Sequence, residues 1–153
     1  MRTLAIDLGT RRVGLALSDE GGKYATPIEV LTVSSPDQAI DLIIPLIKKE
    51  GVQQIVLGLP LNMDDTIGGS AKAAFKWGQQ LAAKTALPVI YVDERLSSFA
   101  AEQTLNDRKR AGEKLTRGRK KEQLDAVAAA SFLQQFLDGK LSPLPQNWIA
   151  DQI

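Results

Sequence analysis

Three acidic residues, far apart in the chain, could together hold metal ions. Asp7 lies within an apolar run, Glu94 closely follows another, and Asp125 lies near the start of a long helical pattern. A carboxylate among apolar residues is costly unless something pairs with it. Carboxylate oxygens suit Mg²⁺ or Mn²⁺, and two such ions about 3.5–4 Å apart can activate water and stabilise a leaving oxygen in phosphodiester cleavage. The three acids are therefore predicted to be metal ligands and catalytic residues.

The composition excludes other routes to hydrolysis. The 153-residue chain has no histidine and no cysteine, which excludes imidazole bases, Ser-His-Asp triads, His-ligated zinc, thiolate metal sites and disulfides. If the protein is an enzyme, its carboxylates must do most of the chemistry. The absence of a membrane-length apolar run and of a signal-peptide pattern leads us to expect a cytoplasmic protein with no membrane partner.

Each acid also has a purely structural interpretation. Asp7 could take a backbone hydrogen bond in the glycine turn that follows it, and Asp125 could be a solvated residue favoured by the helix dipole. Because successive strand residues face opposite sides of a sheet, only one of Asp93 and Glu94 is expected at the site, and Glu94 is preferred for its longer arm. Arg95 could neutralise a phosphate or pair with one of the acids.

The elements that must position these residues follow from hydrophobic patterns and turn signals. Strands are expected over residues 3–8, 13–18, 25–33, 54–59 and 87–92. Helices are expected from 34–37 to 48–51, from about 70 to about 84, over about 98–106 and over about 120–138. Pro45 is expected to kink or divide the first helix.

The order of these elements predicts an α/β fold. Three strands in a row indicate an antiparallel meander, and the later alternation of strand and helix implies right-handed parallel crossovers. We expect a mixed five-stranded sheet of order 3-2-1-4-5 with helices on both faces. Functional groups in such sheets gather beyond the carboxyl ends of the parallel strands, where Asp7, the 58–70 loop and the 93–95 segment all lie.

One segment of the chain is strongly basic. Residues 107–122 carry eight Lys/Arg and three Asp/Glu, a charge of +5, which leaves −4 for the rest of the chain. This asymmetry indicates a local anionic partner, and a flexible arm here could supply phosphate contacts to a nucleic acid, although a solvated loop is the alternative. The predicted substrate-binding residues are Arg11, Arg12, Arg95, Arg108, Lys109, Arg110, Arg119 and Lys121.

Four motifs resemble one known family. They are the segments 7–16, 58–64, 93–98 and 121–129, and in this order they are similar to the YqgF-type family of Holliday junction resolvase-like proteins, also regarded as pre-16S rRNA nucleases. One departure is Asp65, where the family usually has glycine after its Asn-x-Asp, which puts the shape of that loop in doubt.

The resemblance implies an RNase H-like nuclease domain over residues 1–138, followed by a C-terminal tail over 139–153. It further implies a metal-dependent nuclease with Asp7, Glu94 and Asp125 as its acids and Mg²⁺ or Mn²⁺ as its cofactor. The implied partner is structured nucleic acid, either an rRNA precursor or branched DNA, and a homodimer is left open.

Two rival interpretations remain. The Asp-x-Gly-Thr turn at Asp7 also resembles the phosphate-binding hairpin of actin-like ATPases and sugar kinases, but the chain has length for only one such domain and lacks a second turn of that kind. A non-catalytic RNA-binding factor could keep the same fold and bind phosphates without chemistry. Metal-dependent phosphodiesterase activity that depends on Asp7 would separate the enzyme from that factor.

Overall fold

The structure, a computed structural model, describes residues 1–95 and 117–153, with side chains in the second part from residue 124 onward. Within these ranges the strands are β1 (Thr3–Leu8), β2 (Arg12–Ser18), β3 (Ala25–Thr32), β4 (Gln54–Leu59) and β5 (Val89–Asp93). The helices are α1 (Pro36–Glu50), α2 (Gly69–Thr85), α4 (Arg117–Leu137) and α5 (Gln146–Asp151). The helix expected over about 98–106 lies outside the described residues.

The five strands form one sheet in the order β3-β2-β1-β4-β5. The first three strands pair antiparallel, while β4 pairs parallel with β1 and β5 pairs parallel with β4. The predicted mixed sheet and its strand order are therefore confirmed. The hairpin between β1 and β2 is closed by a hydrogen bond from Gly9 N to Arg12 O of 2.9 Å, as the glycine turn after the first apolar run predicts.

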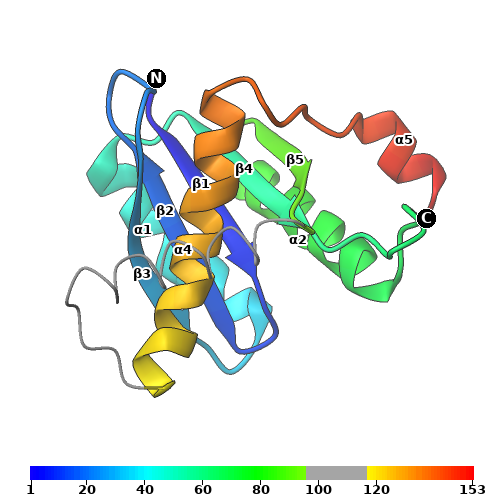
Figure 1. The fold of residues 1–153 in the computed structure, drawn as a ribbon, viewed down its shortest axis with the longest axis horizontal. Coiled ribbons are helices and arrows are strands. Elements are labelled where there is room, and N and C mark those ends of the chain that lie inside the picture. The colour runs from blue at the N-terminus through cyan, green and yellow to red at the C-terminus, as the bar shows by residue number, and fades with distance from the viewer. Residues whose placement is uncertain (96–116) are drawn as a thin grey trace.

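The two faces of the sheet carry side chains of different size. Large residues such as Ile6, Leu15 and Leu57 face the layer of α1 and α2, whereas Ala5 and Ala16 belong to the smaller cluster on the face covered by α4. Figure 1 shows α4 crossing this second face, where it packs against β1, β2, β3 and β4. Small residues let a helix approach a sheet closely, so the backbone of α4 can reach the sheet on this side.

The prediction that Pro45 could divide the first helix is wrong, because α1 runs through Pro45 as one helix of 15 residues. Pro45 removes the N–H that would bond to the carbonyl of Asp41, and both residues are exposed, so water can replace the missing donor. The helix ends as predicted at Gly51, whose φ of 64° is left-handed.

The chain after α4 packs against the sheet. Leu144 N donates to Tyr91 O over 2.7 Å and forms an isolated bridge beside β5. Ile149 of α5 is fully buried in the core, and Trp148 packs against it. Residues 139–153 therefore include a short helix anchored next to β5 (Figure 1). No helix in the described ranges is long and apolar enough to cross a membrane.

Candidate active site

Asp7 lies on the face of β1 that α4 covers. Strand side chains alternate, so Asp7 shares this face with Ala5, which packs in the α4 cluster. Its partner across the β1–β2 ladder is Gly14. The absence of a side chain at Gly14 leaves a space beside Asp7 that the backbone of Asp125 occupies.

Glu94 reaches the same face from the end of β5. Glu94 lies two residues after Val92, another member of the α4 cluster, so both point to the same face. Asp93, between them, points to the opposite face. A Cβ at Gly58 would overlap the carboxylate of Glu94, so this glycine provides the space in which the side chain lies. The carboxyl groups of Glu94 and Asp7 are hydrogen-bonded to each other.

Asp125 approaches from α4. A Cβ at Gly14 would overlap the carbonyl oxygen of Asp125, so the helix backbone rests on the strand next to Asp7. The Asp125 carboxylate forms an ion pair with Arg12, whose Nε lies 3.5 Å from Oδ2. Its negative charge acts on both Asp7 and Glu94. The fold thus brings together the three acids that the sequence analysis singled out.

The environment of Asp7 and Glu94 favours a shared proton. Burial raises the pKa of Asp7 to about 6, opposed by the hydrogen bond with Glu94 and assisted by the charge of Asp125. Burial also raises the pKa of Glu94 to about 9, together with the charge of Asp7 and the hydrogen bond to it. Two carboxylates in one site cannot both ionise cheaply, and the pair titrates as a unit.

This arrangement fits a divalent cation by the chemistry of its donors. All candidate ligands are carboxylate oxygens, which suit Mg²⁺ and Mn²⁺, and a cation would relieve the repulsion that the shared proton now relieves. No group of three or more acidic side chains in the described ranges is already arranged to hold a metal ion. Asp7 and Glu94 meet directly, while Asp125 acts on them through its charge and is held by Arg12.

The metal-free protein is expected to lose stability as pH rises from about 5 to 9. Both pKa values lie above the ordinary values of aspartate and glutamate, so the folded state binds more protons than the unfolded state in this range and stability falls with pH. Asp7→Asn removes one of the two acids. In EDTA at about pH 8 its free energy of unfolding should exceed the wild type's by about 2–3 kcal/mol, the equivalent of two pKa units.

Urea unfolding at about pH 5 and about pH 8 measures this difference. The gap between Asp7→Asn and wild type should shrink at the lower pH, where the wild-type pair holds its protons. Asp41→Asn, on the exposed side of α1, is the control and should follow the wild type at both pH values. A gap that is equal at the two pH values would contradict the shared-proton pair.

The predicted basic contacts are only partly described. Arg11 is exposed in the β1–β2 turn, and it lines a cavity of about 550 Å³ with Arg12, Thr32 and Asp125. Arg108, Lys109 and Arg110 lie outside the described residues, and the side chains of Arg119 and Lys121 are likewise not described. The structure therefore places two of the predicted arginines next to an acid of the site.

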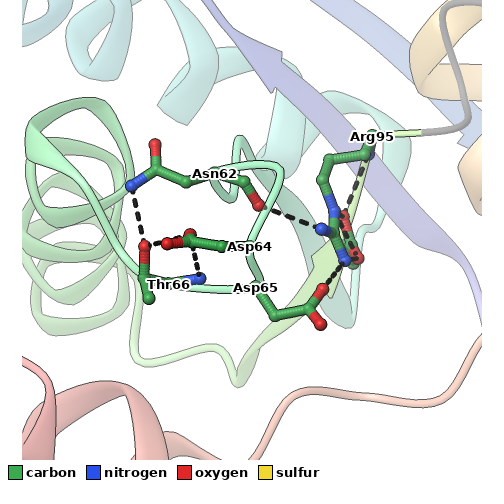
Figure 2. Close-up of polar contacts among 6 residues, drawn as sticks. Asn62, Asp64, Asp65, Thr66 and Arg95 are labelled. Atoms are coloured by element: carbon green, nitrogen blue, oxygen red, sulfur yellow. Dashed lines mark hydrogen bonds and ion pairs between the residues drawn. The ribbon is translucent and has the colours of Figure 1, made fainter.

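Arg95 is paired with acids of its own chain. Its side chain contacts Asp93 and Asp65 and donates to the carbonyl of Asn62 (Figure 2). Burial alone would raise the pKa of Asp93, but hydrogen bonds from the Arg95 side chain and backbone outweigh it and lower that pKa. Of the two alternatives for Arg95, this geometry favours pairing with acids. It also separates Asp93, which binds Arg95, from Glu94, which binds Asp7.

Two features of the site were not singled out by sequence reasoning. Gly14 and Gly58 flank Asp7 on the neighbouring strands and make room for Asp125 and Glu94. The sequence could have indicated them, because each glycine lies two residues from a small or apolar residue of the α4 face. Residues two apart on a strand share a face of the sheet. Asp65 adopts a left-handed φ of 68°, so the turn keeps a conformation that suits glycine despite the departure at this position.

The fold, a mixed five-stranded sheet with helices on both faces, is of the RNase H-like class. Thermus thermophilus RuvC, solved in complex with a Holliday junction substrate, has a similar fold, with a TM-score of 0.57 over 94% of this chain and 99% of that chain. At 15% sequence identity, this similarity concerns the fold alone.

The sequence comparison defines the family. The pattern described as "RuvX: Holliday junction resolvase" matches residues 1–139. A protein of Acidiphilium cryptum (strain JF-5), provisionally named a pre-16S rRNA nuclease, is 37% identical over 146 residues, covering 95% of this chain and 89% of the relative. A protein of Anaeromyxobacter sp. (strain Fw109-5) with the same name is 41% identical over 140 residues, covering 92% and 98%. The chain belongs to the RuvX family and is a nuclease.

Proposed function

We propose that the protein is a divalent-metal-dependent endonuclease that cleaves structured nucleic acid, with precursor 16S rRNA as its substrate and the cytoplasm as its location. The observation that carries this proposal is the hydrogen-bonded pair of Asp7 and Glu94, under the charge of Asp125, at the carboxyl edge of the parallel strands. The names of the relatives support the RNA substrate. The description of the family favours branched DNA as the second candidate.

In this proposal Asp7, Glu94 and Asp125 hold the cations. The chemistry that bound cations would supply here is activation of the attacking water and stabilisation of the leaving oxygen. The chain itself contributes rigid support, because a strand, a strand end and a helix position the three carboxylates. With no histidine in the chain, no imidazole competes with these acids as a base.

The basic residues are proposed to hold the nucleic-acid backbone. Arg11 and Arg12 lie at the cavity next to Asp125, where a phosphate would be close to the acids. The residues Arg108, Lys109, Arg110, Arg119 and Lys121 are proposed to add contacts of the same kind. Such contacts give affinity and orientation without reading sequence, which fits the lack of any base-reading motif.

The decisive experiment incubates the purified protein with a precursor 16S rRNA fragment and, separately, with a four-way DNA junction. We expect cleavage of the RNA with Mg²⁺ or Mn²⁺ and none after EDTA treatment. Cleavage of the junction alone would transfer the proposal to branched DNA. Tight binding of the RNA without cleavage under any metal would instead support the non-catalytic RNA-binding factor.

Replacement of Mg²⁺ by Ca²⁺ is expected to lower cleavage by about 10²-fold or more while leaving nucleic-acid binding intact. Ca²⁺ accepts oxygen ligands at longer distances and with looser geometry than Mg²⁺, so it can occupy the acids without aligning the reacting groups. Parallel cleavage and binding assays with each cation measure the difference. Cleavage that persists undiminished in EDTA would contradict a metal-dependent mechanism.

A further inference from the structure

The guanidinium of Arg95 is almost fully occupied by acceptors of its own chain. Nε donates to both carboxylate oxygens of Asp93, over 3.0 and 2.9 Å. Nη2 contacts Asp93 and, over 2.6 Å, Oδ1 of Asp65, while Nη1 donates to the carbonyl of Asn62 over 3.0 Å. Arginine has five N–H groups in a rigid fork, so these contacts leave at most one for a phosphate.

Asp65 makes its contact from an unfavourable backbone conformation. Its φ of 68° is left-handed, which costs energy for a residue with a Cβ unless its surroundings compensate. Its side chain is 78% exposed, so burial does not hold it there. Two contacts compensate: the turn hydrogen bond from Asp65 N to Asn62 O of 2.9 Å and the ion pair with Arg95 (Figure 2).

The loop that carries Asp65 is held together by its own hydrogen bonds. Asn62 and Thr66 are joined by a backbone bond of 2.9 Å, from Asn62 N to Thr66 O, and by a side-chain bond of 2.9 Å. Asp64 accepts from the backbone and the hydroxyl of Thr66. Residues 62–66 are therefore braced as one turn, and Arg95 contacts this turn at Asn62 and Asp65.

This loop and β5 enclose Glu94. The backbone N–H of Glu94 donates to Leu59 O over 3.3 Å, at the base of the loop. Its chain neighbours Asp93 and Arg95 are bound to each other, and Arg95 is bound to the loop tip at Asp65. The backbone on both sides of Glu94 is thus restrained, while its side chain extends over Gly58 to Asp7.

We propose that Asp93, Arg95 and Asp65 form a latch that positions Glu94 opposite Asp7, and that Arg95 is a positioning residue and not a phosphate contact. The inference rests on the proposed nuclease function. It assigns Asp65 the role of a second carboxylate for Arg95, one that clamps the loop against the end of β5.

Steady-state cleavage kinetics with Mg²⁺ test the latch in Arg95→Gln, Arg95→Lys and Asp65→Asn. Arg95→Gln should lower kcat by about 10–100-fold, the usual effect of losing a residue that orients a ligand, with KM within about twofold. Arg95→Lys should recover only part of kcat, because an ammonium cannot bridge two carboxylates and a carbonyl as the planar fork does. Asp65→Asn should cost less than Arg95→Gln, since Asp93 still holds Arg95.

Arg2→Gln is the matched control. Arg2 also pairs with a carboxylate and a carbonyl, both of Glu50, but it lies at the opposite end of β1, so kcat should not change. The salt dependence of nucleic-acid binding should be the same in Arg95→Gln and wild type. A raised KM with a salt slope reduced by about one unit would show a phosphate contact and overturn the inference.

Hydrogen exchange of the metal-free protein tests the latch without cleavage. Peptides that cover residues 59–68 should exchange faster in Arg95→Gln and in Asp65→Asn than in wild type, and at the wild-type rate in Arg2→Gln. If the wild type cleaves neither substrate, the proposed function fails, and exchange alone decides the latch. Unchanged exchange of this loop in Arg95→Gln would show that no latch exists, whatever the activity.

Discussion

Replacing Asp7 with asparagine is expected to reduce cleavage by about 10³-fold or more while the fold is retained. The substitution keeps the size of the side chain but removes a charged ligand from a group of acids that acts as a unit, where the loss of one member removes most of the activity. Single-turnover cleavage with Mg²⁺, alongside circular dichroism of the folded protein, measures both effects. Full activity in Asp7→Asn would rule out the proposed role of this carboxylate.

The other acids provide an internal comparison. Glu94→Gln and Asp125→Asn are expected to behave like Asp7→Asn, because the three side chains act on one another in the structure. Asp93→Asn should be milder, since Asp93 binds Arg95 and not Asp7. Asp41→Asn, exposed on α1, should retain wild-type activity. A larger loss in Asp93→Asn than in Glu94→Gln would reverse the assignment at this strand end.

Gly14→Ala is expected to damage both stability and activity. The added Cβ would overlap the backbone carbonyl of Asp125, and a backbone cannot rotate away as a side chain can, so α4 must shift off the sheet. Overpacking of this kind costs about 1–3 kcal/mol or more, or about 2–4 °C in Tm per kcal/mol for a chain of this size. Displacing Asp125 by about 1 Å should lower cleavage by about 10²-fold.

Gly69→Ala is the matched control for this prediction. A Cβ at Gly69 meets no atom within 4 Å, and alanine favours a helix more than glycine does, so this variant should be as stable as wild type or slightly more stable. Thermal unfolding and cleavage of both variants measure the contrast. Wild-type stability and activity in Gly14→Ala would contradict the close contact between α4 and β2.

The sheet and the nearness of the three acids could be predicted because local signals specify the elements that carry them. Glycine turns mark the ends of apolar runs, and the alternation of strand and helix after the meander leaves few topologies. The alternation of strand side chains allows only one of Asp93 and Glu94 at the site, and Glu94 was preferred for its longer arm, because chain order alone does not say which face α4 covers. That face becomes clear only when Ala5, Ala16 and the two glycines are seen to lie under the helix.

What could not be predicted depends on contacts between distant segments. Several acids lie near Arg95 in the sequence. Only the fold shows that Asp65, in the preceding loop, lies next to it. The anchoring of residues 139–153 is similar, because a short segment with one buried isoleucine, Ile149, has no periodic pattern strong enough to predict a helix. Pro45 does not divide α1, because its effect depends on exposure, which a helical pattern indicates only approximately.

The central claim is that Asp7, Glu94 and Asp125 together bind divalent cations, and Mn²⁺ binding to the metal-free protein tests it most directly. Isothermal titration at about pH 8 should show binding to the wild type, about tenfold or more weaker binding in Asp7→Asn, Glu94→Gln and Asp125→Asn, and unchanged binding in Asp41→Asn. Binding should also release protons, because the ligands must be deprotonated. Equal Mn²⁺ affinity in the wild type and in all three variants, with no proton release, would contradict the account.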